Sequence, residues 1–188
     1  LALIELAGLA ERNNQPTLAL EFLAEYVERY PEDEIIPEIL LRQAYVYRSI
    51  GVINMTISKL YLVMTAALKI KSSHLEYYKR VVLTAQTEIA ETYFLDRKYE
   101  EASEMYSRLL NNPDEELDVE VVSVKLIRSL ARNEDHVDVV REARQFLTDN
   151  ASSNYQAEVR YLLALSHKGL GEKQDAIREL LLLLEAVE

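Results

Sequence analysis

The sequence contains no cysteine and no tryptophan, and only four glycines and four prolines among its 188 residues. Without cysteine, the chain can form neither a disulfide framework nor a thiolate metal site. With so few turn-forming residues, it has little room for β-hairpins, tight βα loops or glycine-rich loops that hold phosphate. Long helices joined by short turns are the fold class that this composition favours.

Basic charge is also scarce, because 21 lysines and arginines stand against 32 aspartates and glutamates, which gives a net charge of −11. Binding to a phosphate backbone needs a clustered basic surface, so we expect no nucleic-acid partner. The longest apolar run is Leu180–Leu184, far below the roughly 18 residues of a membrane span, and we expect no membrane insertion. No signal peptide is visible, and both ends give the expectation of a piece of a longer protein.

Internal repeats are the strongest positive signal. A small residue early in every second predicted helix recurs at intervals of 37, 46, 37 and 37 residues. A period close to this length, with small and aromatic residues at fixed places, is typical of stacked helix pairs. The residues that mark the repeat are Ala19, Thr56, Ala102, Val139 and Ala176.

Helix signals divide the chain into ten helices. Tyr30-Pro31 and Asn112-Pro113 end helices, since the residue before proline is disfavoured in the α region, and Ser153 with Gln156 has the pattern of a capping box. The predicted helices span 1–13, 16–29, 37–50, 53–71, 74–95, 98–111, 117–131, 136–148, 154–169 and 173–187. They form one repeat domain over 1–188, with repeats near 1–35, 36–72, 73–115, 116–151 and 152–188.

The segments Ala90–Leu110, Pro37–Leu60 and Ala164–Leu184 resemble the tetratricopeptide repeat (TPR) family of bacterial type. The resemblance implies an all-α, right-handed superhelical solenoid of about five antiparallel helix pairs, and the 46-residue interval predicts that the central pair is elongated. The joint from Phe22 to Pro31, followed by Pro37–Tyr47, is also similar to bacterial envelope repeat proteins. Such proteins include the lipoprotein of outer-membrane β-barrel assembly and the Tol–Pal-associated periplasmic protein. This second similarity favours the periplasm or envelope over the cytoplasm.

In stacked helix pairs of this kind, the first helices line a concave surface that is the default binding groove. Arginine and tyrosine on that surface are good anchors for an extended segment of a peptide or protein, and they predict a groove for an acidic or carboxylate-ending segment. The alternative is that the arginines pair with Glu38, Glu88 and Glu91 on neighbouring turns. The residues expected to face the groove are Arg42, Tyr45, Arg48, Thr87, Glu91, Arg128, Tyr161 and Lys168.

Nothing in the sequence predicts an enzyme, a cofactor or a metal site. His74, His136 and His167 lie in different repeats without a second ligand three or four residues away, whereas a metal needs three or four converging ligands. His167 occupies an aromatic core position of the repeat, so we expect a packed side chain. The sequence has no nucleophile, phosphate-binding or dinucleotide-binding motif, and no catalytic residue is assigned.

The last predicted helix is apolar on too many sides for the end of a repeat array, which needs a polar outer face. Either a following helix covers Leu181 and Leu184, or this surface pairs with another molecule, which would make a homo-oligomer. The sequence therefore predicts a non-enzymatic scaffold for protein–protein interaction. The alternative is a structural module for self-association, or for packing within a larger multidomain protein.

Overall fold

The structure, a computed structural model, describes residues 1–69 and 75–185, and these contain ten α-helices and no strand. The predicted all-α fold of helix pairs is therefore confirmed. The chain divides into two compact units, Leu1–Thr92 and Tyr93–Glu188, each treated separately below. Whether the repeats act as one domain stays a prediction.

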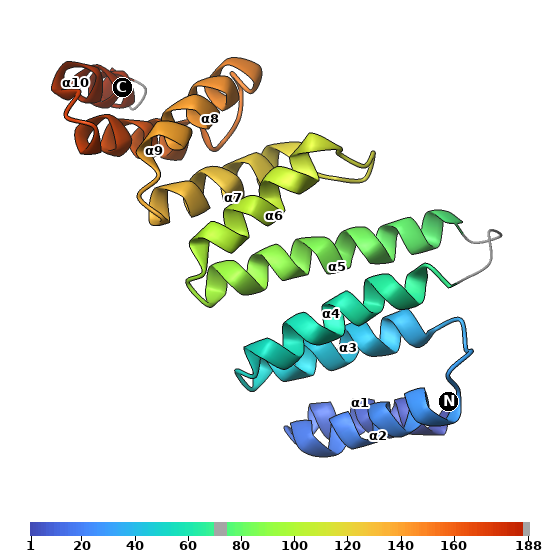
Figure 1. Ribbon diagram of the computed structural model, residues 1–188. Helices are drawn as coiled ribbons and strands as arrows, with labels where there is room; N and C mark the ends of the chain where they lie inside the picture. Colours follow the sequence, from blue (N-terminus) through green and yellow to red (C-terminus); the bar gives the residue numbers. More distant parts are fainter. Residues whose placement is uncertain (70–74, 186–188) are drawn as a thin grey trace. The chain divides into compact units, whose positions relative to one another are not determined.

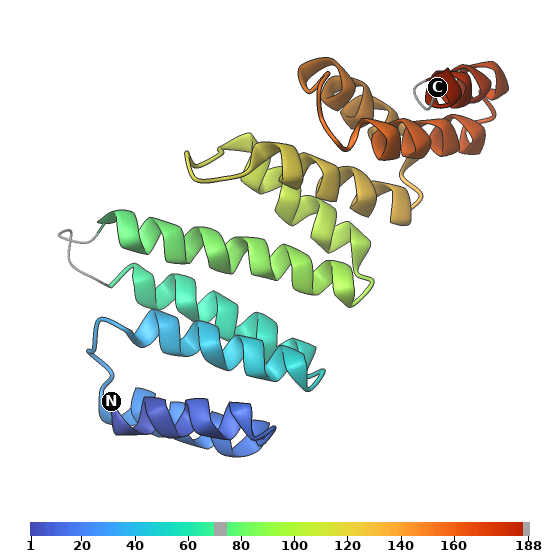
Figure 2. The same ribbon diagram turned by 180° about the vertical axis from the view of Figure 1, so that it is seen from behind.

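The first unit consists of consecutive antiparallel helices, in which α1 lies beside α2, α2 beside α3 and α3 beside α4 (Figures 1 and 2). Small and branched residues fill the contacts, and Ala19, Leu23 and Ala44 are completely buried. The helices of this unit are α1 (Ala2–Arg12), α2 (Pro16–Arg29), α3 (Ile36–Ser49), α4 (Ile53–Ala67) and α5 (Leu75–Leu95), the last of which crosses the boundary between the units.

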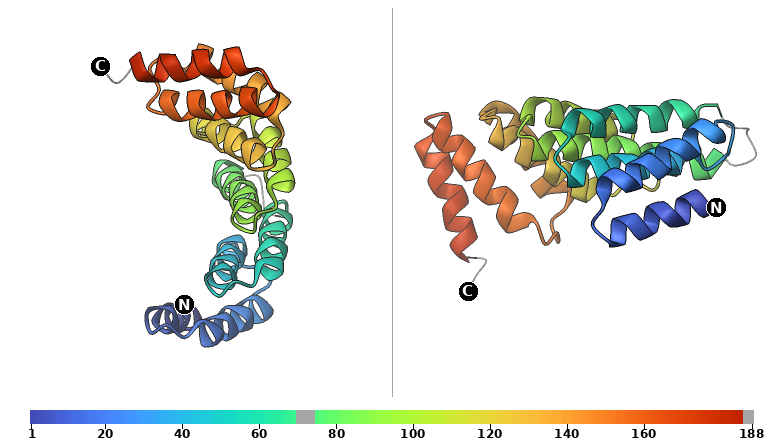
Figure 3. Two further views of the ribbon diagram at one scale, coloured as in Figure 1. Left: turned by 90° about the vertical axis from the view of Figure 1, so that its left-hand side faces the viewer. Right: turned by 90° about the horizontal axis from the view of Figure 1, so that it is seen from below.

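The second unit continues the same pattern, and Figure 3 shows α9 and α10 running antiparallel side by side. Its core includes Tyr106, Ile127, Phe146 and Leu163, each at most 3 % exposed. Its helices are α6 (Tyr99–Asn111), α7 (Val119–Arg132), α8 (His136–Asp149), α9 (Gln156–Gly169) and α10 (Lys173–Glu185).

All five residues that mark the sequence repeat are buried in the second helix of a pair. Small residues at these positions let two helices approach closely, which explains why they recur along the chain. The predicted helix bounds agree with the structure to within two residues, except that α4 ends at Ala67 and not at 71. The expected elongation is therefore found in one helix, α5, which has 21 residues against 15 in α4 and 13 in α6.

The turn inside each helix pair has the same backbone conformation, with one residue at a φ between 56° and 80°. In the first turn, Asn14 N–H donates to the carbonyl of Glu11 and Gln15 N–H to that of Ala10. This is the Schellman arrangement that satisfies the last carbonyls of a helix. The residues in the left-handed conformation are Asn14, Gly51, Arg97, Glu134 and Gly171, spaced at the intervals of the sequence repeat.

The joint before α9 differs from the predicted capping box. Tyr155, not Ser153, is the N-cap of α9, and the Ser153 hydroxyl accepts a hydrogen bond from Tyr155 N–H at 3.0 Å. The Gln156 side chain turns away from Ser153 and donates to the carbonyls of Leu147 and Asn150. Ser153 therefore stabilises the joint rather than the helix end.

Within the described ranges, none of the helices is both long and apolar enough to cross a lipid bilayer.

Candidate functional site

The first helices of the first unit, α1, α3 and α5, are connected by ion pairs that all start from α3. The Arg42 guanidinium donates to Glu11 on α1, with 2.7 Å between Nε and Oε1. Further along α3, Arg48 pairs with Glu88 on α5. The four side chains are 22–33 % exposed, so both ion pairs are partly accessible to solvent. They connect α3 to the helix on either side of it.

Tyr45 lies between these two ion pairs on the same face of α3. Its hydroxyl donates to Glu88 Oε1 at 3.3 Å, and the Arg48 guanidinium lies 5.2 Å from the centre of its ring. Burial raises the pKa of Tyr45, and the nearby Glu88 carboxylate raises it further. The phenol therefore stays neutral and able to donate, while 37 % of the residue remains exposed. A half-exposed tyrosine of this kind offers a rigid apolar face with a polar tip.

A hollow of about 370 Å³ opens beside Arg42 and Tyr45, between α1, α3 and the start of α2. The lining combines polar side chains, such as those of Asn14 and Ser49, with apolar ones, such as those of Val46 and Ile50. The full lining is Glu11, Asn14, Pro16, Arg42, Tyr45, Val46, Ser49 and Ile50. Two of the predicted site residues thus line one concave feature.

The corresponding surface of the second unit also carries an ion pair between first helices, from α7 to α9. Arg128 on α7 donates two hydrogen bonds to the Glu158 carboxylate on α9, of 2.5 Å from Nε and 2.7 Å from Nη2. The guanidinium also lies 5.9 Å from the ring centre of Tyr155. The hydrogen bond from Arg128 lowers the pKa of the Glu158 carboxyl, and the positive charge adds to this effect although burial opposes it.

We expect this ion pair to contribute modestly to stability, because both side chains are almost 40 % exposed. In a double-mutant cycle of Arg128→Ala and Glu158→Ala, the coupling free energy should be about 0.5–1 kcal/mol at neutral pH. Since the folded state lowers the pKa of Glu158, this contribution is present above the unfolded-state pKa and is lost as the pH falls through the folded-state value. Urea unfolding of the four proteins at pH 7 and pH 3 measures it. A coupling that does not change between the two pH values contradicts this assignment.

The remaining predicted residues are Thr87, Glu91, Tyr161 and Lys168. Thr87 on α5 donates to the carbonyl of Leu83 in its own helix, and Glu91 is half-buried on the same helix. Tyr161 on α9 is 50 % exposed, and Lys168 is exposed at the end of that helix. Tyr161 and Lys168 remain available for contact with a ligand.

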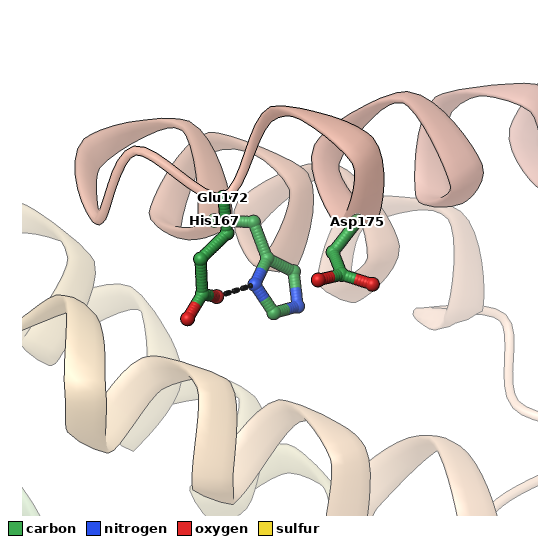
Figure 4. Close-up of side chains that lie close together, drawn as sticks. All are labelled: His167, Glu172 and Asp175. Atoms are coloured by element: carbon green, nitrogen blue, oxygen red, sulfur yellow. Dashed lines mark hydrogen bonds and ion pairs between the residues drawn. The ribbon is translucent and has the colours of Figure 1, made fainter.

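His167 on α9 is buried, as its core position in the sequence predicts. Its Nδ1 donates to Glu172 Oε2 at 2.5 Å, since a carboxylate oxygen can only accept. Nε2 lies 3.4 Å from the Arg144 guanidinium. Asp175 completes a group whose ligand atoms lie within 4.8 Å of one another, but Figure 4 shows the imidazole ring between the two carboxylates. The carboxylates approach the ring from different sides, and the contacts tie the α9–α10 turn to the core.

Comparison with known proteins gives likeness in structure only. No protein-family model matches the chain, and no curated protein matches its sequence. A solved kinesin light chain structure with nearly identical TPR-like repeats, from Podospora anserina, has a TM-score of 0.68 at 20 % identity, over 98 % of this chain and 92 % of that one. The chain has the tetratricopeptide-like fold.

Two further tetratricopeptide-like neighbours are BtubC from P. vanneervenii and MamA from Desulfovibrio magneticus RS-1. BtubC has a TM-score of 0.67 at 16 % identity, over 97 % of this chain and 77 % of that one. MamA has a TM-score of 0.64 at 12 % identity, over 98 % and 92 %. At these identities the likeness concerns the fold alone. The similarity to bacterial envelope proteins stays a prediction.

On this tetratricopeptide-like scaffold, each predicted arginine already has a carboxylate partner. The alternative prediction, in which the arginines pair with nearby glutamates, holds for Arg48, whose partner Glu88 is one of the three glutamates expected. Arg42 and Arg128 pair instead with Glu11 and Glu158, which the sequence did not single out. Both partners lie on the first helix of the adjacent pair, 31 and 30 residues away. A search for acidic residues about one repeat away on first helices would have found them.

Of the described residues of α10, Ala176 alone is buried. Most apolar side chains of this helix are therefore exposed, as the sequence predicts. Leu181 is 53 % exposed and Leu184 67 % exposed, and Ile177 beside them is 57 % exposed. These three residues recur at helical spacing and form one stripe, which we call the α10 stripe.

Proposed function

We propose that the chain is a non-catalytic scaffold that binds a segment of another protein on the surface of its first helices. The observation that carries the proposal is the hollow beside Arg42 and Tyr45, which lies between the first helices of two successive pairs. Stacked helix pairs present extended surfaces of this kind to their partners. The setting that the Tyr30-Pro31 joint favours is a bacterial envelope assembly.

Tyr45 is the anchor that we assign to this surface. The Glu88 hydrogen bond and the Arg48 guanidinium hold its ring in one orientation, so a ligand would lose little entropy by ordering it. The charges around it are balanced, since each arginine on α3 has a glutamate partner. Contact with the ring and hydrogen bonds to Asn14 and Ser49 therefore contribute more to binding than net charge does.

Peptide selection followed by affinity measurement tests this assignment. A displayed random peptide library is selected on the intact chain, and the affinity of the best peptide is measured by fluorescence anisotropy. Tyr45→Ala should weaken binding by at least about tenfold, as expected for a central aromatic anchor. Tyr61→Ala is the matched control, because Tyr61 is 45 % exposed on the second helix α4. Equal affinity of wild type and Tyr45→Ala would contradict the assignment of ligand binding to the first-helix surface.

The α10 stripe supports self-association as a second function. Contiguous exposed apolar residues on a helix often mark a contact with protein, and a second copy of the chain would cover the stripe. Light scattering over a dilution series measures the oligomer, and Leu181→Glu places a charge in the middle of the stripe. A dimer that this substitution dissociates would support self-association, whereas a wild-type monomer at all concentrations would exclude it.

A further inference from the structure

A second concave surface of the first unit lies away from the first-helix hollow, where the joint between α2 and α3 meets α4. This groove has a volume of about 490 Å³. Its lining comes from the end of α2, the joint, the start of α3 and the second half of α4. The residues are Val27, Pro31, Glu32, Asp33, Glu34, Ile36, Pro37, Leu40, Leu62, Thr65, Ala66 and Lys69. We call it the joint groove.

The floor of the joint groove is apolar. The floor consists of three buried residues at the start of α3, Ile36, Pro37 and Leu40. Leu62 on the α4 wall is 44 % exposed and Val27 on the α2 side is half-buried, so apolar surface from two helices faces the opening. Covering this surface with an apolar side chain of a partner would remove it from water, which favours binding.

The rim of the joint groove is acidic. Glu32 and Glu34 are exposed, and neither makes an ion pair with any of the residues that the structure describes. This differs from the first-helix surface, where each arginine of α3 is matched by a glutamate. The described lining contains three carboxylates, of Glu32, Asp33 and Glu34, and one cation, Lys69. The rim thus has excess negative charge that a cationic partner could neutralise.

The joint that carries this rim is held in one conformation. The buried Tyr26 hydroxyl donates to Asp33 Oδ2 at 2.7 Å, and Ile35 N–H donates to Asp33 Oδ1 at 3.1 Å. Proline on each side, at positions 31 and 37, restricts the backbone further. A groove with a fixed rim needs little reorganisation when a ligand binds.

The second unit contains a groove at the equivalent place, with the same backbone and a different rim. Ser153 takes the place of Asp33, accepting from Tyr155 N–H at 3.0 Å as Asp33 accepts from Ile35 N–H. The turn bond from Ser153 N–H to the Asn150 carbonyl, at 3.0 Å, matches that from Asp33 to Tyr30, at 3.1 Å. This groove has a volume of about 440 Å³, and α10 forms its far wall through Leu182 and Leu183.

The two grooves differ in floor and in rim, because Gln156 and Arg160 of the second unit stand where Ile36 and Leu40 form the floor of the first. Where the first unit has Glu32 and Glu34, the second has Ser152 and Asn154. The one cation that lines the second groove, Arg160, is already paired with Glu179 at 3.0 Å. The same backbone therefore presents an acidic rim in one unit and a neutral rim in the other.

We propose that the joint groove of the first unit docks a protein segment in which an apolar side chain is flanked by lysine or arginine. The apolar side chain occupies the floor between Ile36 and Leu62, and the cations pair with Glu32 and Glu34. The equivalent groove of the second unit, with its neutral rim, does not select such a segment. This site is separate from the first-helix surface and does not depend on the function proposed for it.

Methyl NMR of the intact chain tests the proposal with two matched probes. The first is the capped hexapeptide Lys-Arg-Leu-Leu-Arg-Lys, and the second is the acidic counterpart Glu-Asp-Leu-Leu-Asp-Glu. The basic peptide should shift the methyl signals of Leu40 and Leu62 in a saturable way, while those of Leu182 and Leu183 stay in place. The acidic peptide should shift neither pair.

Exchanging the rims provides the decisive variants. Glu32→Ser with Glu34→Asn gives the first unit the rim of the second, and should weaken binding of the basic peptide about 5- to 20-fold. Leu62→Asp, a change at an exposed position, should abolish the response at Leu40, with circular dichroism confirming the fold.

Three results would each overturn the proposal. The first is the absence of any shift at Leu40 and Leu62 with up to millimolar basic peptide. The second is an equal response to the acidic peptide, and the third is unchanged affinity after the rim exchange. Loss of binding in Tyr45→Ala, with the joint groove intact, would concern the first-helix surface alone.

Discussion

Leu23→Ala is expected to lower the free energy of unfolding by about 2–5 kcal/mol, the largest effect that we predict for a single residue. Leu23 lies in α2, the second helix of the first pair, and is 0 % exposed in the core. Removing its branched end takes away apolar contacts and leaves a cavity in a densely packed interior. Urea denaturation followed by circular dichroism gives the free energy of unfolding directly.

The matched control for this prediction lies in the same helix. Leu18 is 37 % exposed, so Leu18→Ala removes the same atoms from a position that is already partly in water and should cost less than about 1 kcal/mol. If the two substitutions were equally destabilising, the burial pattern assigned to α2 would be wrong.

Gly169→Ala is expected to destabilise the chain by about 1–3 kcal/mol, against the usual direction of this substitution. In a helix, alanine is normally preferred over glycine by about 0.5–1 kcal/mol. At Gly169, however, an added Cβ would lie 2.3 Å from Nε2 of His136, with two more ring atoms within 2.7 Å. The start of α8 packs on the end of α9 here, and the imidazole occupies the space that the glycine leaves.

The geometry also predicts a rescue. His136→Ala removes the ring, so in this background Gly169→Ala should be neutral or slightly stabilising. Thermal unfolding of the single and double variants gives the coupling between the two positions. Destabilisation of equal size with and without His136 would contradict the close approach of the ring to the glycine.

The repeat could be predicted from the sequence because its physical cause is local. A small residue is needed wherever two helices of a pair approach closely, and the five markers are buried as expected. The five Schellman turns follow the same intervals, yet glycine occupies the left-handed position in only two of them, at Gly51 and Gly171. Asn14, Arg97 and Glu134 adopt this conformation without the sequence signal that glycine provides, so the repetition of the turn could not be predicted.

The ion pairs could not be predicted, because they depend on which turns of successive first helices are adjacent. The periodicity placed Arg42 and Arg48 on one face of α3 but gave no register between α1, α3 and α5. That register places Glu11 beside Arg42 and Glu88 beside Arg48. The joint groove was missed for a similar reason. Its floor and wall are 22 residues apart, at Leu40 and Leu62, and its acidic rim looks in the sequence like an ordinary solvated loop.

Photocrosslinking at two tyrosine positions tests the central claim most directly, namely that the first-helix surface binds a segment of another protein. p-Benzoylphenylalanine replaces Tyr45 in one protein and Tyr61 in another, both are irradiated with the selected peptide, and the products are mapped by mass spectrometry. We expect crosslinks from position 45, beside the hollow of α1 and α3, and none from position 61. Crosslinks from position 61 with none from position 45 would contradict it.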